Sequence, residues 1–478
     1  MTYDGAYKNR LIAMSSCARV ADLNPRPSWL LLAVGILSIG CSSPATAQPP
    51  SPSAAGNTAT LFENVRIFDG KTSTLSAPAH VLVQGNVIGR ISSDPIDVKA
   101  AADVQVLPGN GRVLMPGLID MHWHAMLVRP TPAMLLASDI GYSTLLAGVE
   151  ATATLMRGFT TIRDLGGPSF SLKRTIDEGL LPGPRIYPSG AVITITSGHG
   201  DFRQFSDLPR TIGGMLARVE QLGGSMIADS PDEVRLRTRE QLMQGASQIK
   251  LTAGGGVASP FSPLDVATFS EAELRAAVEA AENWGTYVCT HAYTPVSIQR
   301  SIAAGVKCIE HGHLMDDATA QLMAEKGIWL STQPFLDLSA ASGLGPAEQA
   351  KLAQVVTGTD RVYALAKKHN IKTAFGTDVL FSKELAERQG AMLAALTRWY
   401  TPAEALIMAT STNAELLKLS GLRNPYPGKL GVVEEGALAD LLLVDGNPLE
   451  NLNLVADPAK NFLVIMKDGR IYKNTLPK

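Results

Sequence analysis

Four of the chain's eight histidines are spaced so that they could hold metal ions. His122 and His124 are two residues apart, so on a β-strand their side chains point the same way and could chelate one ion. His291 and His311 end two later apolar runs and could converge on a second ion. Imidazole nitrogens suit Zn²⁺ best, with Mn²⁺, Fe²⁺ and Co²⁺ as other candidates.

Two further residues could complete this site. Asp378 ends the last apolar run and would close a circle of strands beside the His pair, although an ordinary turn aspartate is the alternative. Lys250 lies in the apolar run Gln248–Leu251, where burial disfavours the charged ammonium group. A neutral lysine there could react with CO₂ to form a carbamate that bridges two metal ions. The alternative is a lysine that reaches solvent or forms an ion pair.

The elements that must position these residues follow from the alternation of short apolar runs with helical stretches, the pattern of parallel β-α-β units. Eight such units predict a (β/α)8 barrel over residues 114–423, with its functional residues at the C-terminal ends of the strands. The predicted strand ends are Met121-His122, Ile162–Asp164, Ala191-Val192, Ile249-Lys250, Cys289–His291, Ile309–His311, Leu330–Thr332 and Gly376–Asp378.

Both ends of the chain carry a different pattern, in which apolar and polar residues alternate. Leu61–Ile67 and His80–Gln84 near the start, and Ala439–Val444 and Phe462–Met466 near the end, are typical of strands. We expect residues 57–113 and 424–478 to form one small β-sandwich domain. The predicted fold class is therefore α/β, a TIM barrel with a β-sandwich built from both chain ends.

The first 47 residues have the three parts of a secretory signal peptide. Arginines precede an apolar run at residues 29–40, which is short for a membrane span, and Ala45–Ala47 offers a cleavage site. A Pro/Ser/Ala-rich linker at residues 48–56 follows. We expect an exported protein, periplasmic or secreted, with no transmembrane domain in the mature chain. Lipid anchoring at Cys41 is the alternative.

The overall charge argues against some classes of partner. The formal net charge is -2 and charged residues make up 18% of the chain. This balance provides no bulk electrostatic attraction for nucleic acid or a membrane surface, so we expect no nucleic-acid partner.

The ordered set of His122-x-His124, Lys250, His291, His311 and Asp378 resembles the amidohydrolase superfamily. Leu114–His122 is similar to its first barrel strand, and Gly436–Leu441 to its return into the small β domain. The resemblance covers essentially the whole mature chain. It implies a distorted TIM barrel and two divalent metal ions, zinc above all, bridged by a carboxylated Lys250. The family often forms large homo-oligomers, so we expect one here.

Other motifs are similar to those of the imidazolonepropionase-like branch, which includes Xaa-Pro dipeptidases (prolidases) and ochratoxin-type carboxamidases. These motifs are Gly158–Asp164, Ser197–Asp201, His291–Tyr293 and Ile309–His313. The branch hydrolyses the amide between an acyl or aminoacyl group and a C-terminal amino acid. The resemblance therefore implies a small amide or dipeptide substrate, such as an Xaa-Pro dipeptide, an N-acyl amino acid or an amide like ochratoxin A.

The expected reaction is attack of a metal-bridging hydroxide on the amide carbonyl. Asp378 would accept the proton of the water and pass it to the leaving nitrogen. By similarity, His199 and Tyr293 would contact the carbonyl oxygen or the substrate carboxylate, and a loop histidine and an edge-packed tyrosine are the alternatives. His313 and Asp164 would orient ligands from behind.

Three other functions compete with this hypothesis. A lactonase or phosphotriesterase would use the same metal ions on a different electrophile. A mononuclear deaminase of the same superfamily would not need Lys250, so this residue argues against it. A non-catalytic binding protein is disfavoured by the complete set of ligands.

Overall fold

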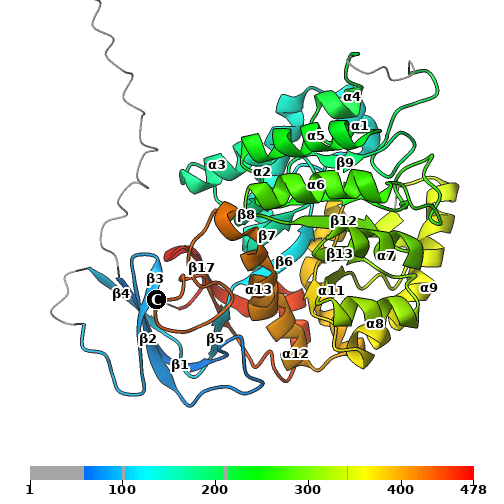
Figure 1. Cartoon of the computed structure of the whole chain (residues 1–478). Coiled ribbons are helices and arrows are strands. Elements are labelled where there is room, and N and C mark those ends of the chain that lie inside the picture. Colours follow the sequence, from blue (N-terminus) through cyan, green and yellow to red (C-terminus); the bar gives the residue numbers. More distant parts are fainter. Residues whose placement is uncertain (1–58, 99–102, 208–213, 342, 478) are drawn as a thin grey trace, which may run out of the picture. The chain divides into compact units, whose positions relative to one another are not determined.

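The computed structural model describes residues 59–98, 103–207, 214–341 and 343–477 (Figure 1). The expected signal peptide at residues 1–47, the linker at 48–56 and Cys41 lie outside the described residues. Within the described ranges, none of the helices combines the length and the apolar character that a membrane span requires.

Strands from both ends of the chain form one eight-stranded sheet with the order β18-β17-β16-β5-β1-β2-β3, and β4 pairs with β1. Along one edge β1 pairs with β2, with a register shift between Phe62 and Val65. Along its other edge β1 pairs first with β4 and then, at its last residues, with β5. The sheet thereby folds over one apolar core, and the predicted sandwich from both chain ends is confirmed. Its strands are β1 (Ala59–Ile67), β2 (Ala79–Gln84), β3 (Val87–Ser92), β4 (Val104–Pro108), β5 (Val113–Pro116), β16 (Leu441–Val444), β17 (Phe462–Lys467) and β18 (Arg470–Asn474).

The chain passes from β5 to the first barrel strand at Gly117. The barrel strands pair in parallel in two groups, β6-β7-β8 and β10-β9-β11-β12-β13-β14-β15. They are β6 (Leu118–Trp123), β7 (Phe159–Asp164), β8 (Arg185–Pro188), β9 (Val192–Thr194), β10 (Ser225–Ile227), β11 (Ile249–Thr252), β12 (Val288–Ala292), β13 (Cys308–His311), β14 (Trp329–Thr332) and β15 (Thr373–Phe375).

Two features distort this barrel. The third barrel strand is interrupted at residues 189–191, so that β8 pairs with β7 while β9 pairs with β11. The last strand meets the first through a hydrogen bond from the backbone N–H of Asp378 to the carbonyl of His122, 2.8 Å long. The predicted (β/α)8 barrel is confirmed, and β10 is an additional short strand beside β9.

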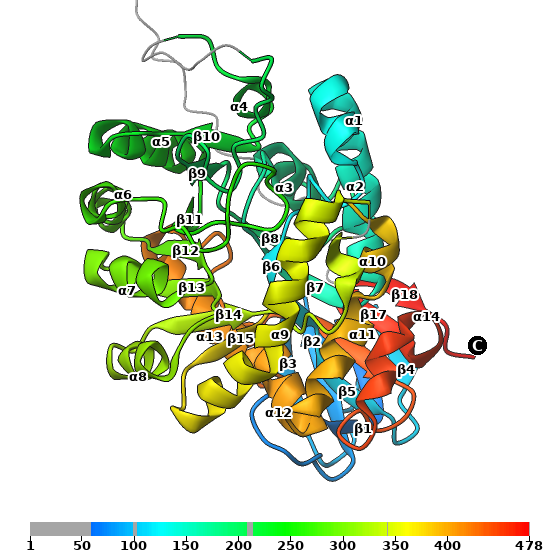
Figure 2. The same ribbon diagram turned by 90° about the vertical axis from the view of Figure 1, so that its right-hand side faces the viewer.

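Helices cover the outside of the barrel, and Figure 2 shows α5, α6, α7 and α8 in a row beside strands β10 to β14. Side-chain caps fix several starts: the Ser230 hydroxyl accepts from the N–H of Glu233, and Ser270 and Glu273 form a capping box. The α-helices are α1 (Pro132–Ala137), α2 (Ile140–Met156), α3 (Phe170–Asp177), α4 (Arg218–Gln221), α5 (Pro231–Gln244), α6 (Glu271–Asn283), α7 (Pro295–Ala304), α8 (Asp317–Glu325), α9 (Pro346–Lys368), α10 (Lys383–Glu387), α11 (Gln389–Ala394), α12 (Pro402–Ile407), α13 (Asn413–Leu417) and α14 (Pro458–Asn461). Shorter helical turns are η1 (Leu338–Ala341), η2 (Ala395–Arg398), η3 (Met408–Thr412), η4 (Lys418–Arg423) and η5 (Leu452–Ala456).

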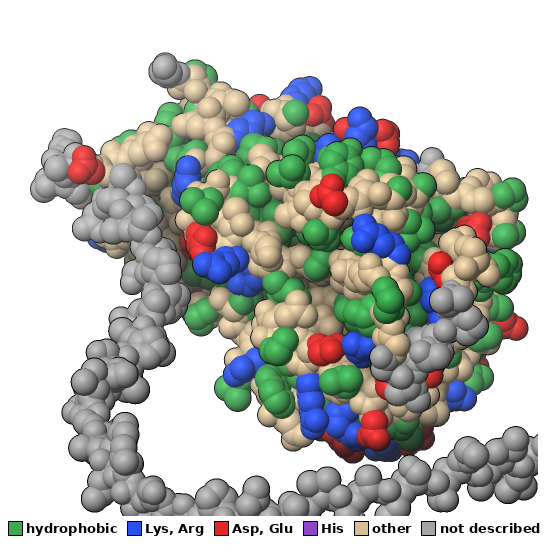
Figure 3. Space-filling model, turned by 90° about the horizontal axis from the view of Figure 1, so that it is seen from above, with side chains coloured by type: hydrophobic (Ala, Val, Ile, Leu, Met, Phe, Trp, Pro, Cys, Tyr) green, Lys and Arg blue, Asp and Glu red, His purple; other side chains and the backbone are tan. Residues whose placement is uncertain are grey.

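The surface carries both signs of charge. On the face seen in Figure 3, Lys and Arg side chains are scattered among Asp and Glu side chains and lie between hydrophobic and polar groups. This mixture agrees with the nearly balanced composition of the chain.

Candidate metal centre

The C-terminal ends of the barrel strands bring the predicted ligand side chains together. Asp378 is partly exposed and the other five are buried. The six residues are His122 on β6, His124 just after it, Lys250 on β11, His291 on β12, His311 at the end of β13 and Asp378 after β15.

One group of donors gathers around Asp378. Its Oδ1 lies 3.1 Å from Nε2 of His124 and 3.3 Å from Nε2 of His122. The amine nitrogen of Lys250 lies 3.4 Å from the same Nε2 of His122. Two ligand atoms that each stand about 2.1 Å from one ion are separated by about 3–4 Å, so this spacing fits a single cation.

A second pair lies beside the first. The rings of His291 and His311 have centroids 4.4 Å apart. Nε2 of His291 lies 2.8 Å from the carbonyl of Gly255, and Nδ1 of His311 lies 2.7 Å from Oε1 of Gln333. These contacts fix both rings and leave the opposite ring nitrogens as donors for a cation.

The protonation states of the histidines and the backbone conformations of two of the residues also favour metal binding. Burial lowers the pKa of His122, His291 and His311 well below the ordinary value, which keeps the imidazoles neutral as metal ligands must be. His311 and Asp378 have left-handed backbones, with φ of +79° and +53°. Such conformations turn a side chain out of the strand direction and are found at functional sites.

The spacing and the chemical types of the ligand atoms also suit a metal ion. His122, His311 and Asp378 each offer a ligand atom within 4.8 Å of the others. Imidazole nitrogen together with carboxylate oxygen suits zinc and similar divalent ions. The residues present therefore fit a divalent metal.

His199 and Tyr293 both lie beside the centre. The ring centroid of His199 is 4.3 Å from that of His291, and its Nδ1 lies 3.0 Å from the hydroxyl of Ser259. The ring of Tyr293 lies 4.8 Å from His291 and 5.0 Å from His311. Burial, followed by the charges of Lys250 and Lys351, lowers the pKa of His199 to about 3. Its ring is therefore neutral.

His313 and Asp164 lie farther back. Nε2 of His313 is 2.9 Å from the carbonyl of Gln333, the residue whose side chain holds His311. The carboxylate of Asp164 accepts from the backbone N–H groups of Ala125 and Gly166, at 3.0 Å and 3.1 Å. Asp164 thus fixes the loop that follows His124, and His313 fixes the segment that carries Gln333.

Two buried charged residues behind His122, Glu310 and Arg163, were not predicted from the sequence to belong to the site. Oε2 of Glu310 lies 3.0 Å from Nδ1 of His122, and Oε1 of Glu310 accepts from Arg163 at 2.7 Å. Arg163 and Glu310 are both fully buried. Although burial opposes the charge, the carboxylate of Glu310 raises the pKa of Arg163. Arg163 lies on β7 and Glu310 on β13, and each is a charged residue within an otherwise apolar strand. This sequence pattern could have identified both residues as part of the site.

Asp120 is another such residue. Its carboxylate accepts from the N–H of His122, from both the N–H and the hydroxyl of Thr377, and from the side chain of Gln389. Asp120 therefore ties the first metal strand to the turn that carries Asp378. Burial raises the pKa of Asp120 to about 6.

Two adjoining cavities open at the centre. One, of about 490 Å³, is lined by the ligands together with Leu127, Phe202 and Phe381. The other, of about 470 Å³, is lined by His199, Tyr293 and apolar side chains including Phe335. His199, His291 and Asp378 line both cavities, so a substrate in either space can reach them.

A distorted (β/α)8 barrel with imidazole, carboxylate and lysine side chains at its strand ends defines a hydrolase with a candidate metal centre. A family model described as "Amidohydrolase family" matches residues 113–472, and the chain belongs to this family. The ochratoxinase of Aspergillus niger is 31% identical over 388 residues, which are 76% of each chain.

Two solved structures are also similar. A prolidase complexed with N-methylphosphonate-L-proline is 33% identical, with a TM-score of 0.80, and the match covers 87% of this chain and 100% of that one. A Xaa-Pro dipeptidase with methionine in its active site is 28% identical, with a TM-score of 0.75 and the same coverage. The resemblance to the amidohydrolases and the prediction of a hydrolase acting on amide bonds are confirmed.

Proposed function

We propose that this protein is a two-metal amidohydrolase that cleaves the amide bond between an acyl or aminoacyl group and a C-terminal amino acid. The names of its relatives, an ochratoxinase, a prolidase and a Xaa-Pro dipeptidase, support this class of substrate. The observation that carries the proposal is the position of Lys250 Nζ, 3.4 Å from His122 and on the strand between β9 and the β12 that carries His291.

The ligands divide between two cation positions. His122, His124 and Asp378 would hold one divalent ion, and His291 and His311 the other. A carbamate on Lys250 would join them. Such ions, when bound, lower the pKa of a water molecule and polarise a carbonyl oxygen. The mixed nitrogen and oxygen donors make zinc the preferred metal.

Asp378 is the group that would move the proton. It is the most exposed of the ligand side chains and lines both cavities of the centre. Its carboxylate can accept a proton from water and donate it to the leaving nitrogen without a change of position. Neutral His199, which lines the same two cavities, can contribute a hydrogen bond to the substrate.

The loop beside His199 is held by a cation. Nζ of Lys351 donates to the carbonyls of Gly256 and Ser259, at 2.9 Å and 2.6 Å. This places a positive charge behind the loop, close to the cavity that His199 and Tyr293 line. A substrate carboxylate bound to these two side chains would be attracted by that charge.

A substrate panel tests the proposal. The purified protein, supplied with zinc, is assayed with N-acyl amino acids, Xaa-Pro dipeptides, a lactone and a phosphotriester. We expect turnover of amides of C-terminal amino acids at rates well above those for the ester and phosphotriester. Turnover of the lactone or phosphotriester alone would instead assign the lactonase or phosphotriesterase function. Absence of turnover with all four classes would favour a binding protein.

Export and assembly are separate parts of the proposal. We propose that the chain is exported, on the basis of its N-terminal sequence, and that it forms a homo-oligomer. N-terminal sequencing of the mature protein distinguishes cleavage after Ala47 from acylation at Cys41. Sedimentation analysis measures the number of subunits.

A further inference from the structure

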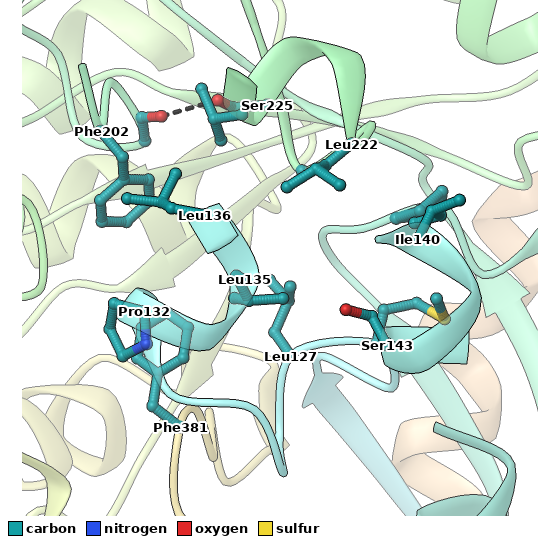
Figure 4. A pocket seen from close by; sticks show the side chains of 15 residues that line it. Leu127, Pro132, Leu135, Leu136, Ile140, Ser143, Phe202, Leu222, Ser225 and Phe381 are labelled. Carbon is teal, nitrogen blue, oxygen red and sulfur yellow. Dashed lines mark hydrogen bonds between the residues drawn. The ribbon is translucent and has the colours of Figure 1, made fainter. Parts of the chain in front are cut away.

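A third cavity lies beside the metal centre where α1, the start of α2 and the end of α4 meet (Figure 4). Its wall is almost entirely apolar. The residues that matter here are Leu127, Leu135, Leu136, Ile140, Phe202 and Leu222. Figure 4 shows side chains from α1, from the start of α2 and from Leu222, which directly follows α4, around the same space.

This cavity adjoins the metal centre. Leu127, Gly200, Phe202 and Phe381 line both the apolar cavity and the 490 Å³ cavity that contains the ligands. Phe381 also lines the cavity of His199 and Tyr293, so its ring stands where all three spaces meet. A molecule whose reacting carbonyl lies at the ligands would therefore enter the apolar cavity by passing Phe202 and Phe381.

The backbone holds Phe381 firmly at this junction. Its φ is +57°, a conformation that bulky residues rarely adopt. Its N–H donates to the carbonyl of Leu127 at 2.9 Å, which ties the turn after Asp378 to the first barrel loop. A strained aromatic residue at the meeting point of three cavities is a candidate specificity determinant.

The distribution of polar side chains between the cavities indicates where the carboxylate end and the acyl end of a substrate would bind. His199 and Tyr293, the donors suited to a carboxylate, line a separate cavity, and no charged side chain lines the apolar one among the described residues. Ser225 already donates to the carbonyl of Gly200 at 2.6 Å. The hydroxyl of Ser143 is 2% exposed and has no partner within the described part of the chain, so it can bond one polar atom of an occupant.

We propose that the apolar cavity binds the acyl half of the substrate, and that this half is a large apolar group. The inference rests on the proposed function and selects among its substrates. The amino group of an Xaa-Pro dipeptide lies one carbon from the reacting carbonyl, at the metal centre, so only its side chain could enter the cavity, whereas a long acyl chain gains free energy for each methylene that it buries there. N-acyl amino acids with long acyl groups are therefore the favoured class, rather than Xaa-Pro dipeptides.

A chain-length series tests the inference. We would measure kcat/KM of the zinc-loaded protein for N-acetyl-, N-hexanoyl- and N-decanoyl-L-leucine, and would measure binding of the same compounds by calorimetry. Each buried methylene is expected to raise kcat/KM and affinity by about two- to fourfold. Leu135→Trp, which fills the cavity, should lower the decanoyl-to-acetyl ratio at least about tenfold.

Leu145→Trp provides the matched control, because Leu145 on α2 is 73% exposed and does not line the cavity. It should leave the whole series unchanged. Equal rates and affinities across the wild-type series, or the same loss in both variants, would overturn the inference while amide hydrolysis still stands. If no compound is hydrolysed, the proposed function fails, and the calorimetric chain-length dependence in the wild type and in Leu135→Trp still decides whether the cavity binds acyl groups.

Discussion

Oε2 of Glu310 lies 3.0 Å from Nδ1 of His122, on the opposite side of the ring from the nitrogen that faces Asp378 and Lys250. The other oxygen of Glu310 is bonded to Arg163. This buried ion pair lies directly behind the first histidine of the centre, whose Nδ1 also lies 3.3 Å from the amide nitrogen of Gln333. A carboxylate in this position orients a metal-binding histidine.

Removal of one member of this chain should be costly. Glu310→Gln leaves the Arg163 guanidinium buried without its counter-charge, so we expect a loss of about 3–5 kcal/mol in the free energy of unfolding. Urea denaturation of the metal-free protein measures it. The double variant Arg163→Met/Glu310→Met should be more stable than the single variant, because both charges are gone.

The same variants should bind metal about 10- to 100-fold more weakly, since His122 loses the carboxylate beside Nδ1 and keeps only the amide of Gln333 there. Glu415→Gln is the control: Glu415 pairs with Lys372 on the surface, where an ion pair contributes about 1 kcal/mol or less. A Glu310→Gln protein as stable and as tightly metal-bound as the control would show that this contact does not position His122.

Replacement of Asp378 should separate proton transfer from folding. Asp378→Asn keeps the shape of the side chain but cannot accept a proton, so kcat/KM should fall by about 10²–10⁴-fold. Circular dichroism and thermal unfolding of the metal-free variant should stay near those of the metal-free wild type, because Asp378 is partly exposed. A variant that retains more than about a tenth of the wild-type activity would exclude Asp378 as the proton carrier.

A methyl group at Gly256 should displace His199. A Cβ added there would lie 2.1 Å from Nδ1 of His199, so the ring must move. We expect Gly256→Ala and His199→Ala to lower kcat/KM by a similar factor, roughly 10- to 100-fold, and the double variant to lose no more than either alone. Gly148→Ala, a helical position whose added Cβ stays 3.3 Å from Leu181, is the control. Additive losses would mean that the two substitutions act independently.

Metal removal should destabilise the folded chain. A ligand that binds only the folded state stabilises it by about 2.7 kcal/mol at a concentration 100 times Kd. We therefore expect chelation to lower the Tm in a thermal scan and zinc to restore it, with a smaller shift in Lys250→Ala. Equal Tm values with and without chelator would argue against a metal bound to the native state.

The barrel and the ligands could be predicted from the sequence for one physical reason. The carboxyl ends of parallel strands meet on one face, so polar residues that end apolar runs, such as His291 and His311, must come together. Six predicted strand ends lie at or next to the ends of β6, β7, β12, β13, β14 and β15. The other two, Ala191-Val192 and Ile249-Lys250, lie at the starts of β9 and β11, which continue to Thr194 and Thr252.

Other features depend on contacts that have no local pattern. Arg163 and Glu310 are 147 residues apart and meet only because β7 and β13 face each other inside the barrel. β1 pairs with β2 along one edge and with β4 and β5 along the other, and the apolar cavity depends on where α1 and α4 lie relative to Phe381. Such arrangements follow from the tertiary packing of segments far apart in the chain.

The metal content of the active enzyme tests the central claim most directly. Divalent ions per chain are measured by elemental analysis alongside amide hydrolysis, in wild type, in Lys250→Ala and in Lys372→Ala, a surface control. The account predicts two ions per active chain, retained in Lys372→Ala, and a joint loss of metal and activity in Lys250→Ala. Full activity with one ion per chain, or two ions and full activity in Lys250→Ala, would contradict it.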